Sequence, residues 1–210
     1  MTTTVIQSDN PKLLQQTVDC LERGGVIVVP TDTVYGLAVL PDRPQSIERL
    51  FGIKSRPANV NLPIMVADKS QLRDLGAQLG PEALMLLDSP LVPGALTLAL
   101  GVDRQASPEW LQNREEIAIR IPDDRFLLQL INKVGPILAT SANRHGNPTP
   151  NELAAILEQL AMPPDLAIDG GVIDTVPSTL VNCHSQPVKI EREGVISSAT
   201  IDRILHAQSR

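Results

Sequence analysis

The sequence is poor in aromatic residues and in cysteine, and each shortage narrows what the chain can be. Phe, Trp and Tyr make up 2% of the 210 residues, so a buried core must be built from Leu, Ile, Val and Ala. Two cysteines, Cys20 and Cys183, are too few for a disulfide framework and favour free thiols in a reducing compartment. We therefore expect a cytoplasmic protein.

Long apolar runs and an excess of positive charge are also missing. No apolar run approaches the ~20 residues that cross a bilayer, and the opening MTTTVIQSDNPK lacks the basic and apolar parts of a signal peptide. The formal net charge is -6 and the pI is about 5.0. This acidity argues against broad nucleic-acid binding but is compatible with one local basic pocket. We expect no membrane partner.

The signatures of several common enzyme classes are absent as well. The sequence has no G-x-x-x-x-G-K-[ST], no G-x-G-x-x-G and no G-x-S-x-G motif. The three histidines, His145, His184 and His206, are not spaced as zinc ligands. These absences disfavour a P-loop enzyme, a dinucleotide dehydrogenase, a serine hydrolase and a zinc enzyme.

What the chain does have is an alternation of helical and strand patterns from end to end. Residues 44–53 show apolar side chains at helical spacing, whereas residues 96–102 and 117–122 alternate with a period of two. We find no internal repeat and no long linker. The pattern predicts one α/β domain over residues 1–210, with its core in about 10–195. We expect an open mixed sheet with helices on its faces.

Two cations lie two residues apart in the segment IKSRPANVN. Arg56 offers a planar fork that suits phosphate or carboxylate, and Lys54 is a compact point charge. Pro57 biases Arg56 toward an extended backbone, on which residues two apart share a face. We therefore expect both side chains to act on one anion. A solvated basic loop explains the segment equally well when it is taken alone.

Two predicted strands each have one face whose residues are poorly suited to a hydrophobic core. Thr97, Ala99 and Gly101 share a face of one strand, and Ala118 and Arg120 share a face of another. Such faces can form the floor of a ligand groove, and the alternative is a solvent-facing surface. The segment PTDTVYG follows a buried strand and makes either a small-ligand pocket or an ordinary turn.

Polar residues also follow later strands. Ser141 and Asn143 in ATSANRHGNPTP come just past a predicted strand, where ligands bind in open α/β sheets and backbone N–H groups can hold phosphate. Asn151 lies nearby and suits either the ligand or a helix cap. Ser178, after a proline, and Arg192, before a glycine, are ordinary strand-end residues when each is considered singly.

Taken together, these segments resemble one family. The chain contains, in order, GGVIVVPTDTVYGL, KSRP, PGALTLAL, IAIRIP, GPILATSAN, DGG, PSTLV and EREG. This order is similar to that of the YrdC-like proteins, the threonylcarbamoyl-AMP synthases, from about Gly24 to Gly194. The resemblance implies a twisted open mixed sheet around a large positively charged cavity. It also implies the short form, without the extra C-terminal domain of longer members.

The resemblance further implies a reaction. L-threonine, bicarbonate and ATP, with Mg²⁺, give threonylcarbamoyl-AMP and pyrophosphate, and a separate threonylcarbamoyl-transferase complex then modifies tRNA. Direct tRNA contact is left open. The threonine contacts implied are Thr33, Arg120 and Ser178. The ATP contacts expected are Lys54, Arg56, Ser141, Asn143, Asn151 and Arg192, with Lys54 and Arg56 as the catalytic pair.

The chain departs from the family pattern at four positions. Val60 replaces a common Asn or Lys, Met65 a His found in some relatives, Ala95 a Pro, and His145 a Ser. Two alternatives therefore stay open. One is an RNA-binding module of the same fold, which the acidic pI disfavours. The other is a paralogue, such as a carbamoyl-transfer domain, that has lost or changed its substrate.

Overall fold

The computed structural model describes residues 2–57, 61–111 and 114–206. Val60, one of the four departures, lies outside these ranges. The helices and strands, in chain order, are β1 (Thr4–Gln7), α1 (Leu13–Glu22), β2 (Ile27–Val29), β3 (Gly36–Val39), α2 (Pro44–Lys54), β4 (Ile64–Met65), α3 (Ser70–Asp74), β5 (Ala77–Gln78), α4 (Pro81–Leu87), β6 (Leu96–Val102), the 3-10 helix η1 (Glu109–Leu111), β7 (Glu116–Arg120), α5 (Arg125–Val134), β8 (Ile137–Ser141), α6 (Leu153–Gln159), β9 (Leu166–Asp169), β10 (Thr179–Asn182), β11 (Lys189–Arg192) and α7 (Ser198–His206).

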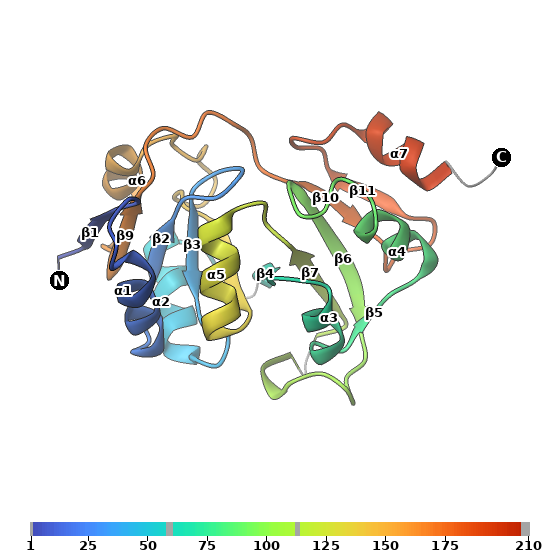
Figure 1. The fold of residues 1–210 in the computed structure, drawn as a ribbon, viewed down its shortest axis with the longest axis horizontal. Coiled ribbons are helices and arrows are strands. Elements are labelled where there is room, and N and C mark those ends of the chain that lie inside the picture. Colours follow the sequence, from blue (N-terminus) through green and yellow to red (C-terminus); the bar gives the residue numbers. More distant parts are fainter. Residues whose placement is uncertain (1, 58–60, 112–113, 207–210) are drawn as a thin grey trace.

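One mixed sheet runs through the described part of the chain. Its strands lie in the order β1-β9-β2-β3-β8-β4-β7-β6-β10-β11, and β5 pairs with β6 beside this path. The pairs β1/β9, β2/β9, β4/β7 and β6/β10 are parallel, and the other adjacent pairs are antiparallel. Helices flank the sheet on both sides of its centre (Figure 1). The predicted mixed α/β fold is therefore confirmed.

Strand β2 shows why this sheet is buried on both faces. Val26 and Val28 belong to one apolar cluster, together with residues of α2 and α6. Ile27 and Val29 belong to the other cluster, which contains residues of α1 and α5. Successive side chains of a strand point to opposite faces, so an unbroken run of β-branched residues needs helices on both sides. Figure 1 shows α1 and α5 side by side over this half of the sheet.

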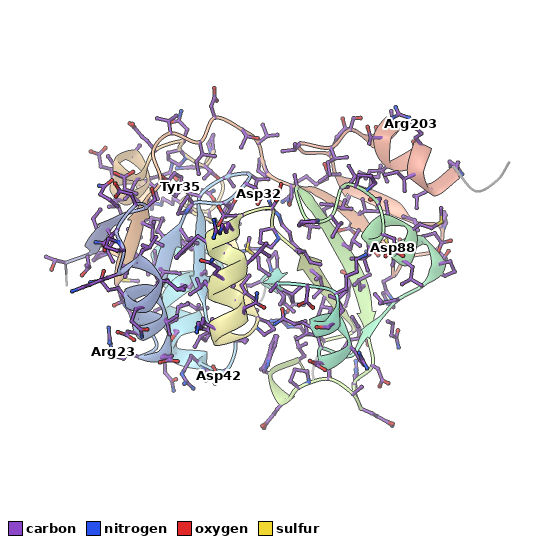
Figure 2. The ribbon with its side chains drawn as sticks, in the orientation of Figure 1. Arg23, Asp32, Tyr35, Asp42, Asp88 and Arg203 are labelled. Carbon is purple, nitrogen blue, oxygen red and sulfur yellow. The ribbon has the colours of Figure 1, made fainter. Side chains whose placement is uncertain are left out.

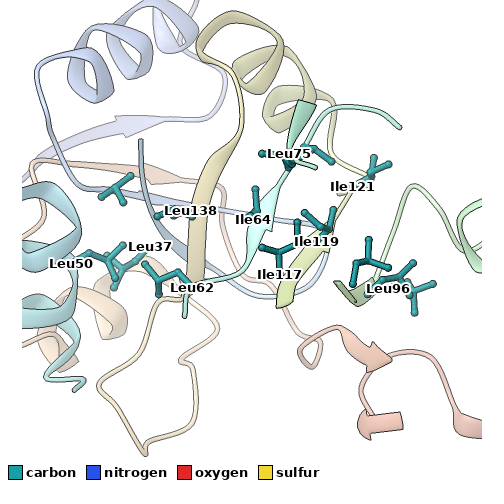
Figure 3. Packing of buried hydrophobic residues seen from close by; sticks show 14 of the residues in the cluster. Leu37, Leu50, Leu62, Ile64, Leu75, Leu96, Ile117, Ile119, Ile121 and Leu138 are labelled. Carbon is teal, nitrogen blue, oxygen red and sulfur yellow. The ribbon is translucent and has the colours of Figure 1, made fainter. Parts of the chain in front are cut away.

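The two-residue strand β4 joins the two halves of the sheet. Ile64 is paired with Leu138 of β8 on one side and with Ile119 of β7 on the other. All three side chains are buried in one cluster, in which Figure 3 shows Ile64 between the other two. Packing of this central region places the end of β8 close to the faces of β6 and β7, where polar residues were predicted to form a groove.

The expected extended backbone at Lys54–Arg56 is wrong. Helix α2 continues through Lys54, and Ser55 adopts the left-handed conformation with φ 51°. Ser55 N–H donates to Gly52 O at 3.0 Å and Arg56 N–H donates to Phe51 O at 2.9 Å. Lys54 is therefore helical and Ser55 left-handed, so the two cations are not two residues apart on one extended segment, and the bias of Pro57 concerns only Arg56, beyond the helix end. Lys54 and Arg56 consequently leave the helix end in different surroundings.

No helix in the described ranges is both long and apolar enough to cross a membrane.

Candidate functional site

A cavity of about 320 Å³ opens between the two halves of the sheet. Thr97 of β6 and Ala118 and Arg120 of β7 line it, as predicted for these strand faces, whereas Ala99 and Gly101 are buried and are not among its described lining residues. Residues of the β2–β3 connection, of β8, of the segment after α2 and of the region around β10 and β11 also line it. Six of the nine predicted site residues line the cavity, namely Thr33, Arg56, Arg120, Ser141, Ser178 and Arg192.

Arg56 has an incomplete set of partners in the described structure. Its Nη1 donates to Thr140 Oγ1 at 3.2 Å, whereas its Nε is buried without a hydrogen-bond partner among the described residues. Burial lowers the pKa of this guanidinium. A buried charged donor without an acceptor is unfavourable. An anion that enters the cavity would remove this deficit, and a phosphate oxygen matches the guanidinium fork.

Lys54 does not line the cavity but lies behind it, with 3% of its surface exposed. Its Nζ donates to Ser141 O at 2.6 Å, Ser141 Oγ at 3.3 Å, Asn143 Oδ1 at 2.6 Å and Asn143 O at 3.1 Å. Ser141 Oγ in turn donates to Asn143 Oδ1 at 2.6 Å. Lys54 thus ties the end of α2 to the turn after β8. Of these three residues, Ser141 is the one that reaches the cavity.

The charge of Lys54 should titrate within reach of ordinary buffers. Burial, and then repulsion from Arg56, lower its pKa from 10.5 to about 8. Between these values the unfolded chain holds a proton that the folded chain has released, so Lys54 makes the free energy of unfolding rise with pH. Over the same interval a neutral amine replaces the cation behind Ser141, which weakens attraction for an anion.

We therefore expect the affinity for ATP to fall several-fold between about pH 7 and pH 9 in the wild type, because this interval spans the pKa of Lys54. In Lys54→Arg the affinity should stay nearly level, because arginine remains charged. Calorimetric titration at each pH measures the difference. Identical pH profiles for the two proteins would contradict this assignment.

Arg120 of β7 also lines the cavity and is 6% exposed. Its Nε donates to Gly94 O at 3.0 Å, its Nη1 to Thr33 Oγ1 at 2.7 Å and its Nη2 to Asp32 Oδ1 at 2.7 Å. Figure 2 labels Asp32 at the upper edge of the sheet. A guanidinium carries five N–H bonds, so these contacts leave one on each terminal nitrogen. Arg120 is held rigidly and can still donate to a carboxylate.

A third group of polar residues surrounds Ser178. Arg192 Nε and Nη2 donate to Ser178 O at 3.1 and 2.9 Å, and Thr97 Oγ1 lies 2.7 Å from Ser178 Oγ. Burial, and then Arg120, lower the pKa of Arg192. A Cβ at Gly194 would lie 2.1 Å from Pro177 O, so only glycine allows the chain after β11 to pass this close. That contact explains the glycine of the EREG motif.

Asn143 and Asn151 do not line the cavity. Asn143 is buried and supports Ser141 from behind, as described above. Asn151 is exposed, and its backbone carbonyl accepts from Ile173 N–H at 2.8 Å. Helix α6 begins at Leu153 with Glu152 at its N-cap and without a side-chain capping bond. The alternative that Asn151 caps this helix is therefore wrong.

Several residues of the site were not singled out from the sequence. Tyr35 is fully buried, accepts from Gly170 N–H at 2.9 Å and donates to Gly171 O at 2.8 Å. It thereby fixes the start of the segment that leads from β9 to Ser178, and it lies at the upper edge of the sheet (Figure 2). The motif PTDTVYG pointed to this region, but the partners of Tyr35 and Asp32 come from distant segments.

The lining of the cavity favours anions. Three arginines contribute to it, and no acidic residue is among its described lining residues. Asp32, behind Arg120, is the carboxylate paired with this set. The described residues include no group of three or more His, Cys, Asp or Glu side chains that could hold a metal ion. The site is suited to a ligand that brings its own negative charge.

This fold and this site define an α/β protein with an arginine-lined cavity at the centre of a mixed sheet. A family model described as "Telomere recombination" (Sua5_yciO_yrdC) matches residues 19–194. The chain belongs to this Sua5/YciO/YrdC family, as the resemblance implied.

The chain is similar both to a longer relative, of which it matches little more than half, and to a relative of about its own length. "Threonylcarbamoyl-AMP synthase" of Bacillus subtilis is 33% identical over 201 residues, and the match covers 94% of this chain but 58% of that protein. An "Uncharacterized protein" of Haemophilus influenzae is 30% identical over 200 residues, with 92% and 96% covered. The chain therefore spans little more than half of the Bacillus relative and nearly all of the Haemophilus one.

The similar solved structures likewise include one longer chain and one of about the same length. Pyrococcus abyssi Sua5 "complexed with L-threonine" superimposes with a TM-score of 0.85 at 28% identity, over 97% of this chain and 61% of that one. Escherichia coli YciO superimposes with a TM-score of 0.81 at 28% identity, over 96% and 100%.

Proposed function

We propose that the chain is an L-threonylcarbamoyladenylate synthase, a nucleotidyltransferase that makes threonylcarbamoyl-AMP and pyrophosphate from L-threonine, bicarbonate and ATP. The observation that carries this proposal is the buried Nε of Arg56, which has no acceptor among the described residues, in a cavity that Arg120 and Thr33 also line. The guanidinium of Arg56 suits a phosphate, and the pair of Arg120 and Thr33 suits an amino acid. The relatives named threonylcarbamoyl-AMP synthase support the same assignment.

The nucleotide is proposed to bind along Arg56, Ser141 and Arg192, which line one connected cavity. Lys54 and Asn143 keep Ser141 in place and add positive charge from behind. Magnesium enters as the ATP complex, held by phosphate oxygens and water, which is its usual mode in such sites. Asn151 lies outside the cavity, so it can meet only an outlying part of the nucleotide.

The amino acid is proposed to bind at Arg120, Thr33 and Ser178. The two remaining N–H bonds of Arg120 receive the carboxylate, and the hydroxyls contact the other polar groups. Met65 also lines the cavity, at the position where some relatives have His. A thioether cannot donate a hydrogen bond, which leaves a changed amino-acid preference as the second candidate.

The proposed chemistry depends on positioning more than on acid–base catalysis. The amine of threonine and bicarbonate form a carbamate with loss of water. A carbamate oxygen then attacks the α-phosphorus of ATP in line, the bond to the bridging oxygen breaks, and pyrophosphate leaves with the electron pair. Cations placed at the phosphates stabilise the charge in such a transfer, and bound reactants react as neighbours.

The mixed anhydride formed in this way is a reactive acyl donor. We propose that a separate threonylcarbamoyl-transferase complex consumes it to modify an adenosine of tRNA, in the cytoplasm. Direct contact of this chain with tRNA is not needed for the chemistry.

Pyrophosphate release tests the proposal. The protein is mixed with ATP, Mg²⁺, bicarbonate and each member of an amino-acid panel, and pyrophosphate is followed over time. We expect release only when ATP, bicarbonate and L-threonine are all present. Release with another amino acid would favour the changed paralogue. No amino-acid-dependent release, together with salt-sensitive binding of RNA, would favour an RNA-binding module.

A further inference from the structure

The hydroxyl of Thr33 has its hydrogen-bond direction set by its neighbours. Thr31 Oγ1 donates to Val34 O at 2.7 Å, since a carbonyl oxygen can only accept. Thr31 Oγ1 lies 3.1 Å from Thr33 Oγ1 and has no second proton to give. Thr33 must therefore be the donor in that contact.

The hydrogen-bonding groups of Thr33 that are still unused decide whether it can donate to a ligand in the cavity or only accept from it. A hydroxyl has one proton and two lone pairs. The proton of Thr33 goes to Thr31, and one lone pair accepts from Arg120 Nη1 at 2.7 Å. One lone pair is left. Thr33 lines the cavity, so it offers a ligand an acceptor and no donor.

Thr31 is fully used in setting this direction. Its Oγ1 donates to Val34 O, accepts from Thr33 N–H at 3.0 Å and accepts from the Thr33 hydroxyl. Its surface is 7% exposed and that of Thr33 is 1% exposed. Both hydroxyls are therefore largely buried, and reversing the arrangement would leave Val34 O without its donor.

We propose that Thr31 is a positioning residue that makes Thr33 a pure acceptor, so that an N–H or O–H group of the amino acid, and not its carboxylate, binds at Thr33. This rests on the proposed function. The carboxylate is then left to the free N–H bonds of Arg120, which point the substrate in one direction across the cavity. Two adjacent groups of opposite hydrogen-bond character thus set the orientation of the amino acid.

The test compares Thr31→Val with Thr31→Ser in the 210-residue chain. Valine keeps the branched shape but has no hydroxyl, whereas serine keeps the hydroxyl and loses the methyl group. Binding of L-threonine, L-valine and ATP to each protein is measured by calorimetry, and KM and kcat for pyrophosphate release are measured alongside.

We expect Thr31→Val to bind L-threonine about five- to twenty-fold more weakly, the effect of one misdirected buried hydrogen bond. Thr31→Ser should bind within about two-fold of the wild type, and ATP affinity should be unchanged in both, because Arg56 hydrogen-bonds Thr140 whereas the Thr31 hydroxyl contacts Val34 and Thr33. The loss should appear in KM more than in kcat. If Thr33 meets the hydroxyl, L-valine binding will be unaffected, whereas equal losses for both ligands identify the amine.

Three results would overturn the inference. Thr31→Val could bind L-threonine as tightly as the wild type, Thr31→Ser could be as weak as Thr31→Val, or ATP affinity could fall by the same factor as threonine affinity. The second would show that the methyl group matters, and the third that the whole cavity is distorted. A wild type that binds no L-threonine would instead refute the proposed function, and the inference with it.

Discussion

Replacing Arg56 with alanine should reduce threonine-dependent pyrophosphate release at least about 100-fold without lowering the stability of the fold. The side chain makes one hydrogen bond, to Thr140 Oγ1, and keeps a buried Nε without an acceptor in the described structure. Its charge is partly desolvated, as its lowered pKa indicates. The folded chain therefore gains little from Arg56, whereas a bound phosphate gains a guanidinium.

Activity and thermal unfolding measured on the same preparations test this separation. Arg56→Lys should keep part of the activity, because it retains the charge but loses the fork. Arg104→Ala is the matched control, since Arg104 is an exposed guanidinium paired with Glu115 on the surface. It should leave activity unchanged. If Arg56→Ala retains activity, the phosphates do not bind at this wall. A large fall in unfolding temperature would show that Arg56 supports the fold.

Asp32→Asn should destabilise the fold by about 3 kcal/mol, the scale expected when one member of a buried ion pair is lost. Arg120, at 6% exposure, would keep its charge in the wall of the cavity without a counter-charge, because Asp32 Oδ1 is its carboxylate partner at 2.7 Å. For a chain of this length the unfolding temperature should fall by roughly 6–12 °C.

The chain offers a matched control on its surface. Asp42 pairs with Arg43 at 2.9 Å, but the carboxylate side chain is 58% exposed. Figure 2 labels both aspartates, Asp32 at the upper edge of the sheet and Asp42 at the lower. Asp42→Asn should change stability by less than about 1 kcal/mol, as is usual for exposed pairs. Equal effects of the two substitutions would show that the Arg120 pair is not shielded from water.

Removing both charges, in Asp32→Asn with Arg120→Met, should lower the free energy of unfolding by less than the sum of the two single changes.

Much of the fold could be predicted from the sequence because its elements leave local patterns. The helices α1, α2 and α5 and the strands β6 and β7 show their periods within a dozen residues. Strands β1, β3 and β5 were not predicted. β1 is a largely exposed edge strand that pairs with β9 about 160 residues away, and β3 directly follows the turn-like PTDTVY.

Part of the site could also be predicted from the sequence, because several residues that line the cavity belong to short motifs. Residue types and their order pointed to six residues that all line the cavity, namely Thr33, Arg56, Arg120, Ser141, Ser178 and Arg192. The expected shared face of Lys54 and Arg56 was wrong, because the end of α2 could not be located from a proline bias alone. The functional roles of these residues stay predictions.

The sequence by itself determined the class of fold, the family and the residue types that gather at the strand ends. These follow from periodicity and from short motifs, which depend on neighbours a few positions apart. Only the tertiary structure decided which cation faces the cavity, which is buried behind it, and which way the hydroxyl of Thr33 points. Those properties depend on desolvation and on hydrogen-bond partners such as Lys54 with Ser141 and Thr33 with Arg120, each 87 residues apart in the chain. No local pattern records such a pairing, because it exists only once the two halves of the sheet have packed together.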